Sequence, residues 1–532
     1  MAKEHDNIYK TINQLLLRSN IESKPLAAFY IQFPRGRDVY IILPHFREQV
    51  RKLEYNNNRI FVLDYFLLEK DVTEAQLWEH VAAQFLFPHK IITGDKIITD
   101  KKKQYLRKII LETLKILVEE HKIAALNLRI KPEYFLFEKL RRLSGVSPLI
   151  RREISQFTQY SEDILTLFQD NIHDFTEAAE ELVSEGILTH YQGLFAVTEK
   201  AYNEMTSKTV LLDINKIERM IKNIFTDRSS LGASLKLFLE NVENVPQVYL
   251  MSHIPKIPDS QDFLYLSTGI GLQRLNEQYD IIDFAKKFYE EAKFEVKKIG
   301  KTLNSTYHLI IRRDRDDVLE FFVKKYLNWT DVKWVVARIW TLGIRNFSML
   351  ASSRMANEIY FVNFLREVGF NSPEIVHVNW RGYTLYQEYV HGRTLFDLWI
   401  AKHETRWDYA YKVGRLLAEV HSSGIVLGDC KPENFLIEEN SGRIYVIDLE
   451  QASKKGDKAW DLTELLFYPG HYLDSRTAAE IAGRIASGYA STGDIEQLKK
   501  ALSPKYLRVL APWTPVWVQK AISDEIKTLL KS

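Results

Sequence analysis

A polar loop between an expected helix and an expected β-hairpin constrains this 532-residue sequence more than any other feature. The helix predicted over residues 407–421 ends at Gly424, because glycine is favoured at the left-handed position that closes a helix. The loop then reads Gly-Asp-Cys-Lys-Pro-Glu-Asn over residues 428–434. Apolar runs at 435–437 and 444–447, separated by an Asn-Ser-Gly turn, predict a hairpin that places Asp448 at the end of its second strand.

This pair of segments resembles the catalytic core of the protein-kinase-like superfamily, in which Asp-x-Lys-Pro-x-Asn forms the catalytic loop and an Asp after an apolar strand begins the metal-binding segment. The spacing fits, with Asn434 five residues after Asp429 and Asp448 fourteen residues after Asn434. Phosphoryl transfer depends mainly on positioning and on neutralising charge. The resemblance implies two catalytic residues, Asp429 as the acceptor of the hydroxyl proton and Lys431 beside the γ-phosphate. It also implies ATP and Mg²⁺ as cofactors, with Asn434 and Asp448 as the metal ligands.

The segment upstream of this core supplies the phosphate-binding lysine that such a site needs. The alternating run 318–326 predicts a strand, and its Phe-Phe-Val triplet resembles the one that precedes this lysine in the family, which places the lysine at Lys324. Lys325 is the alternative, because neighbouring side chains of a strand point to opposite faces and only one of the two can enter the cleft. Glu358, the only acid in the helix predicted over 353–365, is expected to pair with that lysine.

Two further segments are expected to contact the nucleotide. Residues 383–392 resemble the hinge of the family, where backbone groups of Glu388 and Val390 would meet adenine. The turn at 299–306 stands where a glycine-rich loop would cover the phosphates, but Gly300 is its only glycine. We therefore expect Ser305, together with Thr306 and Lys301, to replace the backbone contacts of that loop.

Departures from the eukaryotic pattern indicate an atypical kinase. Leu427-Gly428 replaces the usual His-Arg pair, Asp448-Leu449-Glu450 replaces Asp-Phe-Gly, and Asp461 follows Asp448 after only thirteen residues, which leaves no room for a long activation loop. These features are similar to the compact group that includes the KEOPS-complex kinase, the RIO kinases and the lipopolysaccharide kinases. The resemblance covers about residues 294–475. It implies that Asp461 braces the catalytic loop.

An α/β domain is predicted at residues 1–155, with strands at 27–33, 39–43 and 60–67 and a long helix over 103–121. It distantly resembles a degenerate nucleotidyltransferase, because Asp38 follows a glycine-containing turn, although Tyr40 stands where a second metal carboxylate would lie. An unrelated α/β domain is the alternative.

Residues 156–215 predict a winged-helix domain, since two helices are followed by a strand, a glycine turn and a second strand. Its second helix carries four glutamates between residues 177 and 185 and no basic residue, so a protein partner is favoured over nucleic acid. A helical connector and linker is expected at 216–293. The predicted fold class is therefore α+β, with a bilobal kinase-like domain (lobes 294–390 and 391–532) preceded by an α/β and a winged-helix domain.

Composition excludes several classes of protein. The 72 basic and 70 acidic residues give a formal charge of +2, so any nucleic-acid or membrane contact must be local. The single cysteine, Cys430, excludes an intrachain disulfide framework and a multi-thiolate metal site. The start of the sequence has no signal-like core and no apolar run approaches a membrane span, so the expected location is cytoplasmic, with no membrane partner. The oligomeric state stays open.

The expected activity is that of an ATP-dependent atypical serine/threonine protein kinase. An RNA (tRNA) kinase is the alternative, favoured by the extra domains and by basic segments at 101–103 and 297–298. A third hypothesis is an ATPase that switches a larger complex. The motif does not separate these acceptors, because a protein hydroxyl and an RNA hydroxyl need the same base, lysine and metal.

Overall fold

The computed structural model describes residues 2–159, 161, 163–207, 256–288, 293–299, 304–312, 317–328 and 348–531. The chain divides into two compact units. The first comprises Met1–Glu120 and Leu128–Tyr265, and the second comprises His121–Asn127 and Leu266–Ser532. None of the helices within the described ranges is long and apolar enough to cross a membrane.

The first unit begins with a five-stranded mixed sheet in the order β3-β4-β2-β1-β5. Its elements are α1 (Ala2–Arg18), β1 (Ala27–Phe33), β2 (Gly36–Leu43), β3 (Val50–Tyr55), β4 (Asn58–Asp64), α2 (Tyr65–Glu74), η1 (Ala82–Leu86) and β5 (Lys90–Thr93). Strands β1 and β2 are antiparallel, whereas β2 and β4 are parallel.

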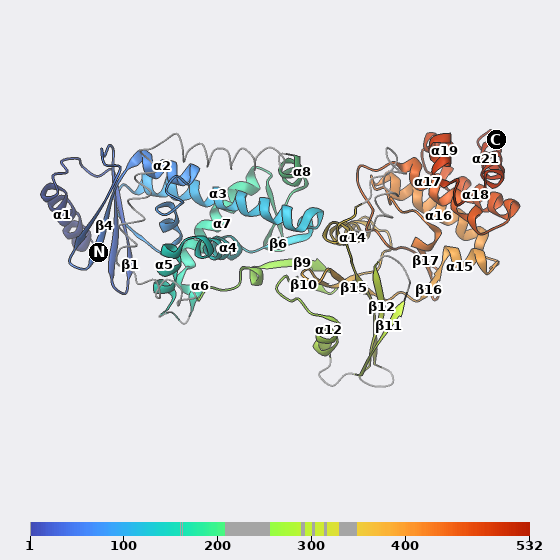
Figure 1. The fold of residues 1–532 in the computed structure, drawn as a ribbon, viewed down its shortest axis with the longest axis horizontal. Helices are drawn as coiled ribbons and strands as arrows, with labels where there is room; N and C mark the ends of the chain where they lie inside the picture. The colour runs from blue at the N-terminus through green and yellow to red at the C-terminus, as the bar shows by residue number, and fades with distance from the viewer. Residues whose placement is uncertain are drawn as a thin grey trace. The chain divides into compact units, whose positions relative to one another are not determined.

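Strand alternation divides the core of this sheet into two faces. Ile12 and Leu16 of α1 pack with one set of buried strand residues, so α1 covers that face, as Figure 1 shows beside β1 and β4. On the other face Tyr40 stacks between Phe29 and Phe61, at centroid distances of 4.9 and 5.0 Å. The expected strand over 60–67 ends earlier, at Asp64, because the Asp64 carboxylate accepts from Phe66 N and starts α2.

The rest of the first unit is mainly helical. Its elements are α3 (Asp95–His121), β6 (Leu128–Ile130), α4 (Pro132–Val146), α5 (Pro148–Thr158), α6 (Ile164–Leu167), α7 (Gln169–Ser184), β7 (Leu188–Tyr191), β8 (Leu194–Val197), α8 (Glu199–Ser207) and η3 (Ser260–Phe263). Strands β7 and β8 form an antiparallel hairpin, and β8 also pairs with β6. This helix–hairpin order matches the expected one, and the winged-helix assignment remains a prediction.

The acidic helix α7 is held by basic residues of α3. Both guanidinium nitrogens of Arg107 bond to Glu185, at 2.5 and 2.6 Å, and Lys103 pairs with Glu181. The neighbouring Lys101 and Lys102 pair with Glu69 and Asp174. The basic segment at 101–103 is therefore engaged within the unit, which removes one of the reasons for expecting RNA.

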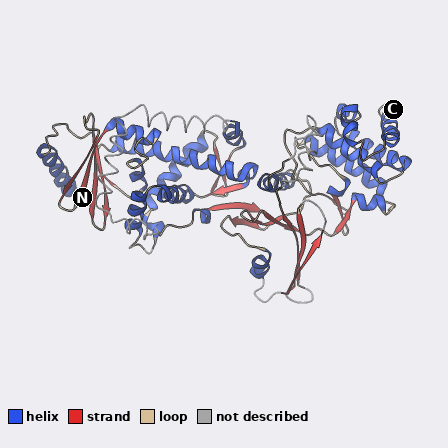
Figure 2. Ribbon diagram, in the orientation of Figure 1, coloured by secondary structure: helices blue, strands red, loops and turns tan. Residues whose placement is uncertain are grey.

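The second unit contains an antiparallel sheet of order β11-β12-β13-β15-β14 followed by a helical part. Figure 2 shows these strands in red and the later helices in blue. The elements up to the sheet's last strand are η2 (Lys122–Asn127), β9 (Leu264–Thr268), β10 (Gly271–Arg274), α12 (Ile281–Phe288), β11 (Lys293–Ile299), β12 (Ser305–Arg312), β13 (Val318–Lys325), α14 (Ala351–Glu367), β14 (Ile375–Asn379) and β15 (Thr384–Glu388). Part of the region expected to be helical thus forms β9 and β10, and of the described residues there only α12 and η3 are helical.

The helical part starts with a short sheet of order β16-β17-β18. Its elements are β16 (Gly392–Thr394), α15 (Leu395–Ile400), α16 (Arg406–Ser422), η4 (Pro432–Asn434), β17 (Phe435–Glu438), β18 (Ile444–Val446), α17 (Lys458–Phe467), η5 (Tyr468–His471), α18 (Ser475–Ala490), α19 (Ile495–Ala501), α20 (Pro504–Leu510) and α21 (Val516–Leu529). Helices α16 and α18 approach closely at Gly414 and Gly488, where an added Cβ would lie 2.0 Å from a carbonyl oxygen of the facing helix.

Two histidines are buried in aromatic surroundings of the second unit. His377 on β14 is 2% exposed and lies 5.2 Å, between ring centroids, from each of Tyr279, Phe284 and Tyr386. Burial lowers the pKa of His377 to about 3 and that of His121 to about 4. Both are therefore neutral in the folded protein across the physiological range.

We predict that the free energy of unfolding falls as the pH drops from about 6.5 toward 4. In this window the unfolded chain binds protons at His377 and His121 while the folded chain does not, so protonation favours unfolding by about 2 kcal/mol per histidine at pH 5. Chemical denaturation at pH 7.5 and pH 5 measures the change. The variant His377→Phe keeps a ring in the cavity and should show a shallower pH dependence; an unchanged dependence would contradict this account.

Candidate active site

A cavity of about 440 Å³ lies in the second unit between the sheet and the catalytic loop segment. Residues from both parts line it, including Thr306, Lys324, Glu388, Val390, Asn434 and Asp448. The predicted lysine, hinge and metal-binding residues, which are up to 124 positions apart, therefore share one cavity.

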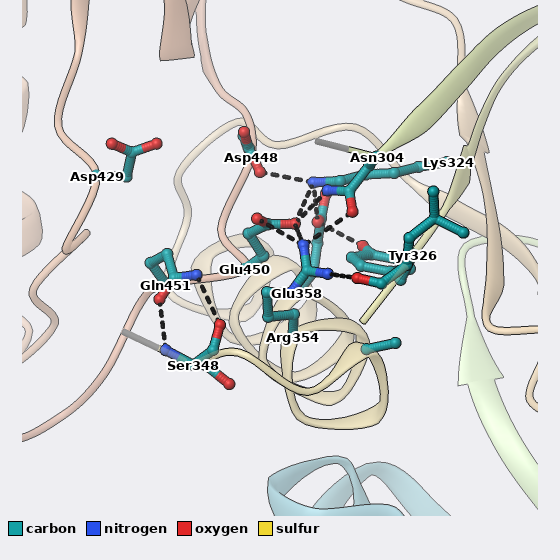
Figure 3. A network of polar contacts seen from close by, with 12 residues as sticks. Asn304, Lys324, Tyr326, Ser348, Arg354, Glu358, Asp429, Asp448, Glu450 and Gln451 are labelled. Carbon is teal, nitrogen blue, oxygen red and sulfur yellow. Dashed lines mark hydrogen bonds and ion pairs between the residues drawn. The ribbon is translucent and has the colours of Figure 1, made fainter. Parts of the chain in front are cut away.

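Lys324 is the central cation of this cavity. Its Nζ lies 2.7 Å from Glu358 Oε2 and 2.6 Å from Asp448 Oδ1, as Figure 3 shows. Burial lowers the pKa of Lys324, but the carboxylates of Asp448, Glu358 and Glu450 outweigh burial and raise it well above its usual value. Lys324 is thus a fixed positive charge. Of the two lysines considered, Lys324 enters the cavity, whereas Lys325 is exposed on the other face of β13.

Asp448 is the most exposed of the three carboxylates around Lys324. Burial raises the pKa of Asp448 to about 7, although the Lys324 ammonium acts in the opposite direction. Its backbone φ of 60° is left-handed, a conformation that is costly for a residue with a side chain and often marks a functional site. A cation or a lysine beside this partly exposed carboxylate therefore stabilises its charged form.

The catalytic loop brings three predicted residues together. Lys431 Nζ lies 2.9 Å from Asp429 Oδ1, and Asn434 Nδ2 donates to the backbone oxygen of Asp429 at 2.8 Å. Because the amide nitrogen of Asn434 is used inside the loop, its Oδ1 is the atom that can act as a metal ligand. Asn434 and Asp448 both line the cavity.

Asp461 holds the start of the loop in place. This buried carboxylate accepts from Leu427 N at 2.6 Å and from Gly428 N at 2.8 Å, and it lies 3.1 Å from His421 Nε2. Gly428 has a φ of +73°, and a Cβ there would lie 2.4 Å from Gln451 O. Only glycine fits this position, which explains the Gly-Asp pair seen in the sequence.

Only some of the residues predicted to contact the nucleotide line the cavity. Glu388 and Val390 line the cavity, as does Thr306, but Ser305 does not. Ser305 pairs across the sheet with Lys325 and Thr306 with Lys324, so alternation turns Ser305 away from the site and brings in its neighbours Asn304 and Thr306. Gly300 and Lys301 lie outside the described residues.

Sequence reasoning missed three residues of the site. Glu450, Arg354 and Asn304 form a buried cluster beside Lys324 (Figure 3). Arg354 lies one helical turn before Glu358 on α14, a spacing that could have indicated a shared face. The sequence offered no comparable signal for Glu450, whose contacts come from residues 96 to 146 positions away.

Residues 313–483 match the lipopolysaccharide kinase (Kdo/WaaP) family. A probable bifunctional tRNA threonylcarbamoyladenosine biosynthesis protein of Methanococcus vannielii is 25% identical over 207 residues, 38% of this chain and 36% of that protein. The KEOPS complex subunit Bud32 of Pyrococcus abyssi is 31% identical over 101 residues, 19% of this chain and 44% of that protein. The chain therefore spans less than half of the length of these two relatives.

We predict that Lys324→Ala lowers ATP turnover at least about a hundredfold, because it removes the cation that is expected to face the phosphates. Release or transfer of labelled phosphate from γ-labelled ATP measures the loss. Lys325→Ala is the matched control and should keep its activity, since that side chain is exposed. The opposite pattern would mean that Lys325, and not Lys324, enters the cavity.

Asp461→Asn is expected to lower the free energy of unfolding by about 3 kcal/mol, because a single amide oxygen cannot replace both carboxylate oxygens that accept from the two backbone N–H groups. Denaturant titration gives the value. Asp457→Asn, on a more exposed carboxylate that caps the same helix, should cost about 1 kcal/mol. Equal losses of unfolding free energy in the two variants would contradict the role of Asp461 in holding the loop.

Proposed function

We propose that the protein transfers the γ-phosphoryl group of ATP to a serine or threonine hydroxyl of a protein, because its residues 313–483 match the lipopolysaccharide kinase (Kdo/WaaP) family and part of the chain is similar to the KEOPS complex subunit Bud32. One observation carries the proposal: Lys324 bridges Glu358 and Asp448 at a cavity that Glu388, Val390 and Asn434 also line. This is the arrangement that positions a nucleoside triphosphate for phosphoryl transfer.

The charge balance supports a divalent cation in this cavity. One carboxylate oxygen from each of Glu358, Asp448 and Glu450 lies within 4.8 Å of the others, so three carboxylates gather around the two cations Lys324 and Arg354. Asp448 and Asn434 offer oxygen ligands, which Mg²⁺ prefers. In this proposal they hold the metal, which would neutralise charge on the phosphates.

The residues of the catalytic loop have distinct roles in the proposal. Asp429 accepts the proton of the incoming hydroxyl, and Lys431, 2.9 Å from it, orients that carboxylate and balances charge on the transferring group. Lys324 holds the phosphates, and the backbone of Glu388 and Val390 holds adenine. Asn304 and Thr306 take the place proposed for Ser305.

An ATPase subunit of a larger complex is the second candidate. It is favoured by the similarity to a protein described as a KEOPS complex subunit and to one described as a probable bifunctional tRNA threonylcarbamoyladenosine biosynthesis protein. In this version the first unit, including the α7–β8 segment, contacts protein partners. An RNA (tRNA) kinase is the remaining candidate.

Incubation of the full chain with γ-labelled ATP and cell extract separates these candidates. We predict that label appears in protein, that Asp448→Asn abolishes it, and that circular dichroism of the variant stays native. Label in free phosphate alone would favour the ATPase, and label in RNA would favour the RNA kinase. No label in any fraction, with a folded wild-type protein, would contradict the proposed phosphoryl transfer.

Binding of Mg²⁺ and ATP can be tested without turnover. A ligand that binds only the folded state raises the free energy of unfolding by about 2.7 kcal/mol at one hundred times its Kd. We predict a thermal shift with ATP plus Mg²⁺ that is larger than with ATP alone, and that Asp448→Asn loses the difference. A wild-type protein that gains nothing at millimolar Mg·ATP would contradict the nucleotide site.

A further inference from the structure

Glu450 occupies the position that glycine holds in the usual Asp-Phe-Gly segment, and its side chain is buried. Its Oε2 lies 3.0 Å from Lys324 Nζ and accepts from Asn304 Nδ2 at 2.8 Å. Its Oε1 lies 3.2 Å from Arg354 Nη1. A glycine could make none of these contacts, so Glu450 adds a carboxylate to the site.

The three carboxylates around Lys324 differ in their access to solvent. The side chain of Asp448 is 37% exposed, whereas those of Glu358 and Glu450 are 2% and 7% exposed. A cation that arrives from the cavity can therefore reach Asp448 more readily than the other two. When Asp448 binds a metal, Glu358 and Glu450 are the carboxylates left to hold Lys324.

Glu450 also links separate parts of the unit. Asn304, which lines the cavity, donates to Glu450 and accepts from Arg354 Nη1 at 2.8 Å. On α14, Asn357 Nδ2 donates to the backbone oxygen of Glu450 at 3.1 Å. The cluster thus joins the residue before β12, helix α14 and the metal-binding segment.

Gln451, the residue after Glu450, contacts a residue that precedes α14. The side chain of Gln451 accepts from Ser348 N at 3.0 Å and donates to Ser348 O at 3.2 Å, as Figure 3 shows. Asp448, Glu450 and Gln451 are therefore all attached to groups that lie before or on α14. Their position and that of α14 cannot change independently without breaking buried polar contacts.

A purely structural role is the competing explanation. Arg354 is fully buried and needs a counter-charge, which Glu450 supplies. Removing Glu450 alone would leave that guanidinium uncompensated and lower stability whatever its role in the reaction. A test must therefore separate stability from the placement of Lys324.

We propose that Glu450 is a positioning residue that keeps Lys324 in place when Asp448 turns to the metal, and that it couples this metal site to Asn304 and α14. The inference rests on the proposed phosphoryl transfer from ATP. It assigns Glu450 a role in holding the phosphate-binding lysine, beyond the general pairing of that lysine with Glu358.

The test compares Glu450→Gln, the double variant Arg354→Met with Glu450→Gln, and the matched control Glu419→Gln, whose carboxylate pairs with Arg415 on the surface of α16. For each, kcat, KM for ATP and the Mg²⁺ concentration for half-maximal rate are measured at a temperature where all are folded. We expect Glu450→Gln to lower kcat about tenfold to a hundredfold. The control should match the wild type.

The double variant distinguishes a positioning role of Glu450 from a purely structural one. It removes both buried charges, so its unfolding temperature should recover toward the wild-type value while its kcat stays low. Recovery of kcat together with stability would overturn the inference. So would a large increase in the half-maximal Mg²⁺ concentration for Glu450→Gln, because Glu450 would then be a metal ligand.

The wild-type protein separates failure of this inference from failure of the proposed function. A wild type that neither binds Mg·ATP nor turns it over would contradict both. An active wild type whose Glu450→Gln variant keeps full kcat would contradict only the role of Glu450.

Discussion

The buried ammonium group of Lys324 is the interaction on which the second unit depends. Removing a lysine from water is costly unless opposite charges surround it, and here three carboxylates lie within 3.0 Å of its nitrogen. Those carboxylates come from helix α14 and from the segment after β18. One side chain on β13 thereby joins the sheet, the helix and the metal-binding segment.

The catalytic loop is fixed by a second buried charge. Asp461 on α17 accepts from two backbone N–H groups of the loop, and Glu464, one turn later, accepts from Cys430 N at 2.7 Å. The loop that carries Asp429 is therefore held by two carboxylates of α17. Asp461 follows Asp448 after only thirteen residues, so the helix that holds the loop is close in sequence to the segment that carries Asp448.

Local patterns predicted much of this architecture. The sequence predicted strand β13, the helix before the catalytic loop and the hairpin that follows the loop. Each of these elements depends on residues that are neighbours in the sequence. The resemblance of the Phe-Phe-Val triplet placed the lysine at Lys324, because alternation alone does not say which face meets the cleft. Ser305 was expected in a loop, but it is the first residue of β12 and does not line the cavity. The strand β3 was not foreseen, since Arg51, Lys52 and Glu54 obscure its apolar face. Glu450 and Arg354 meet only through the tertiary fold.

Lysine footprinting tests the central claim most directly. An acyl-phosphate derivative of ATP transfers its acyl group to a lysine that lies beside the bound phosphates, and mass spectrometry identifies the modified residue. The account predicts acylation at Lys324, protection by Mg·ATP, and no comparable protection at Lys325. Acylation of Lys325 in preference to Lys324, or labelling that Mg·ATP does not reduce, would contradict it.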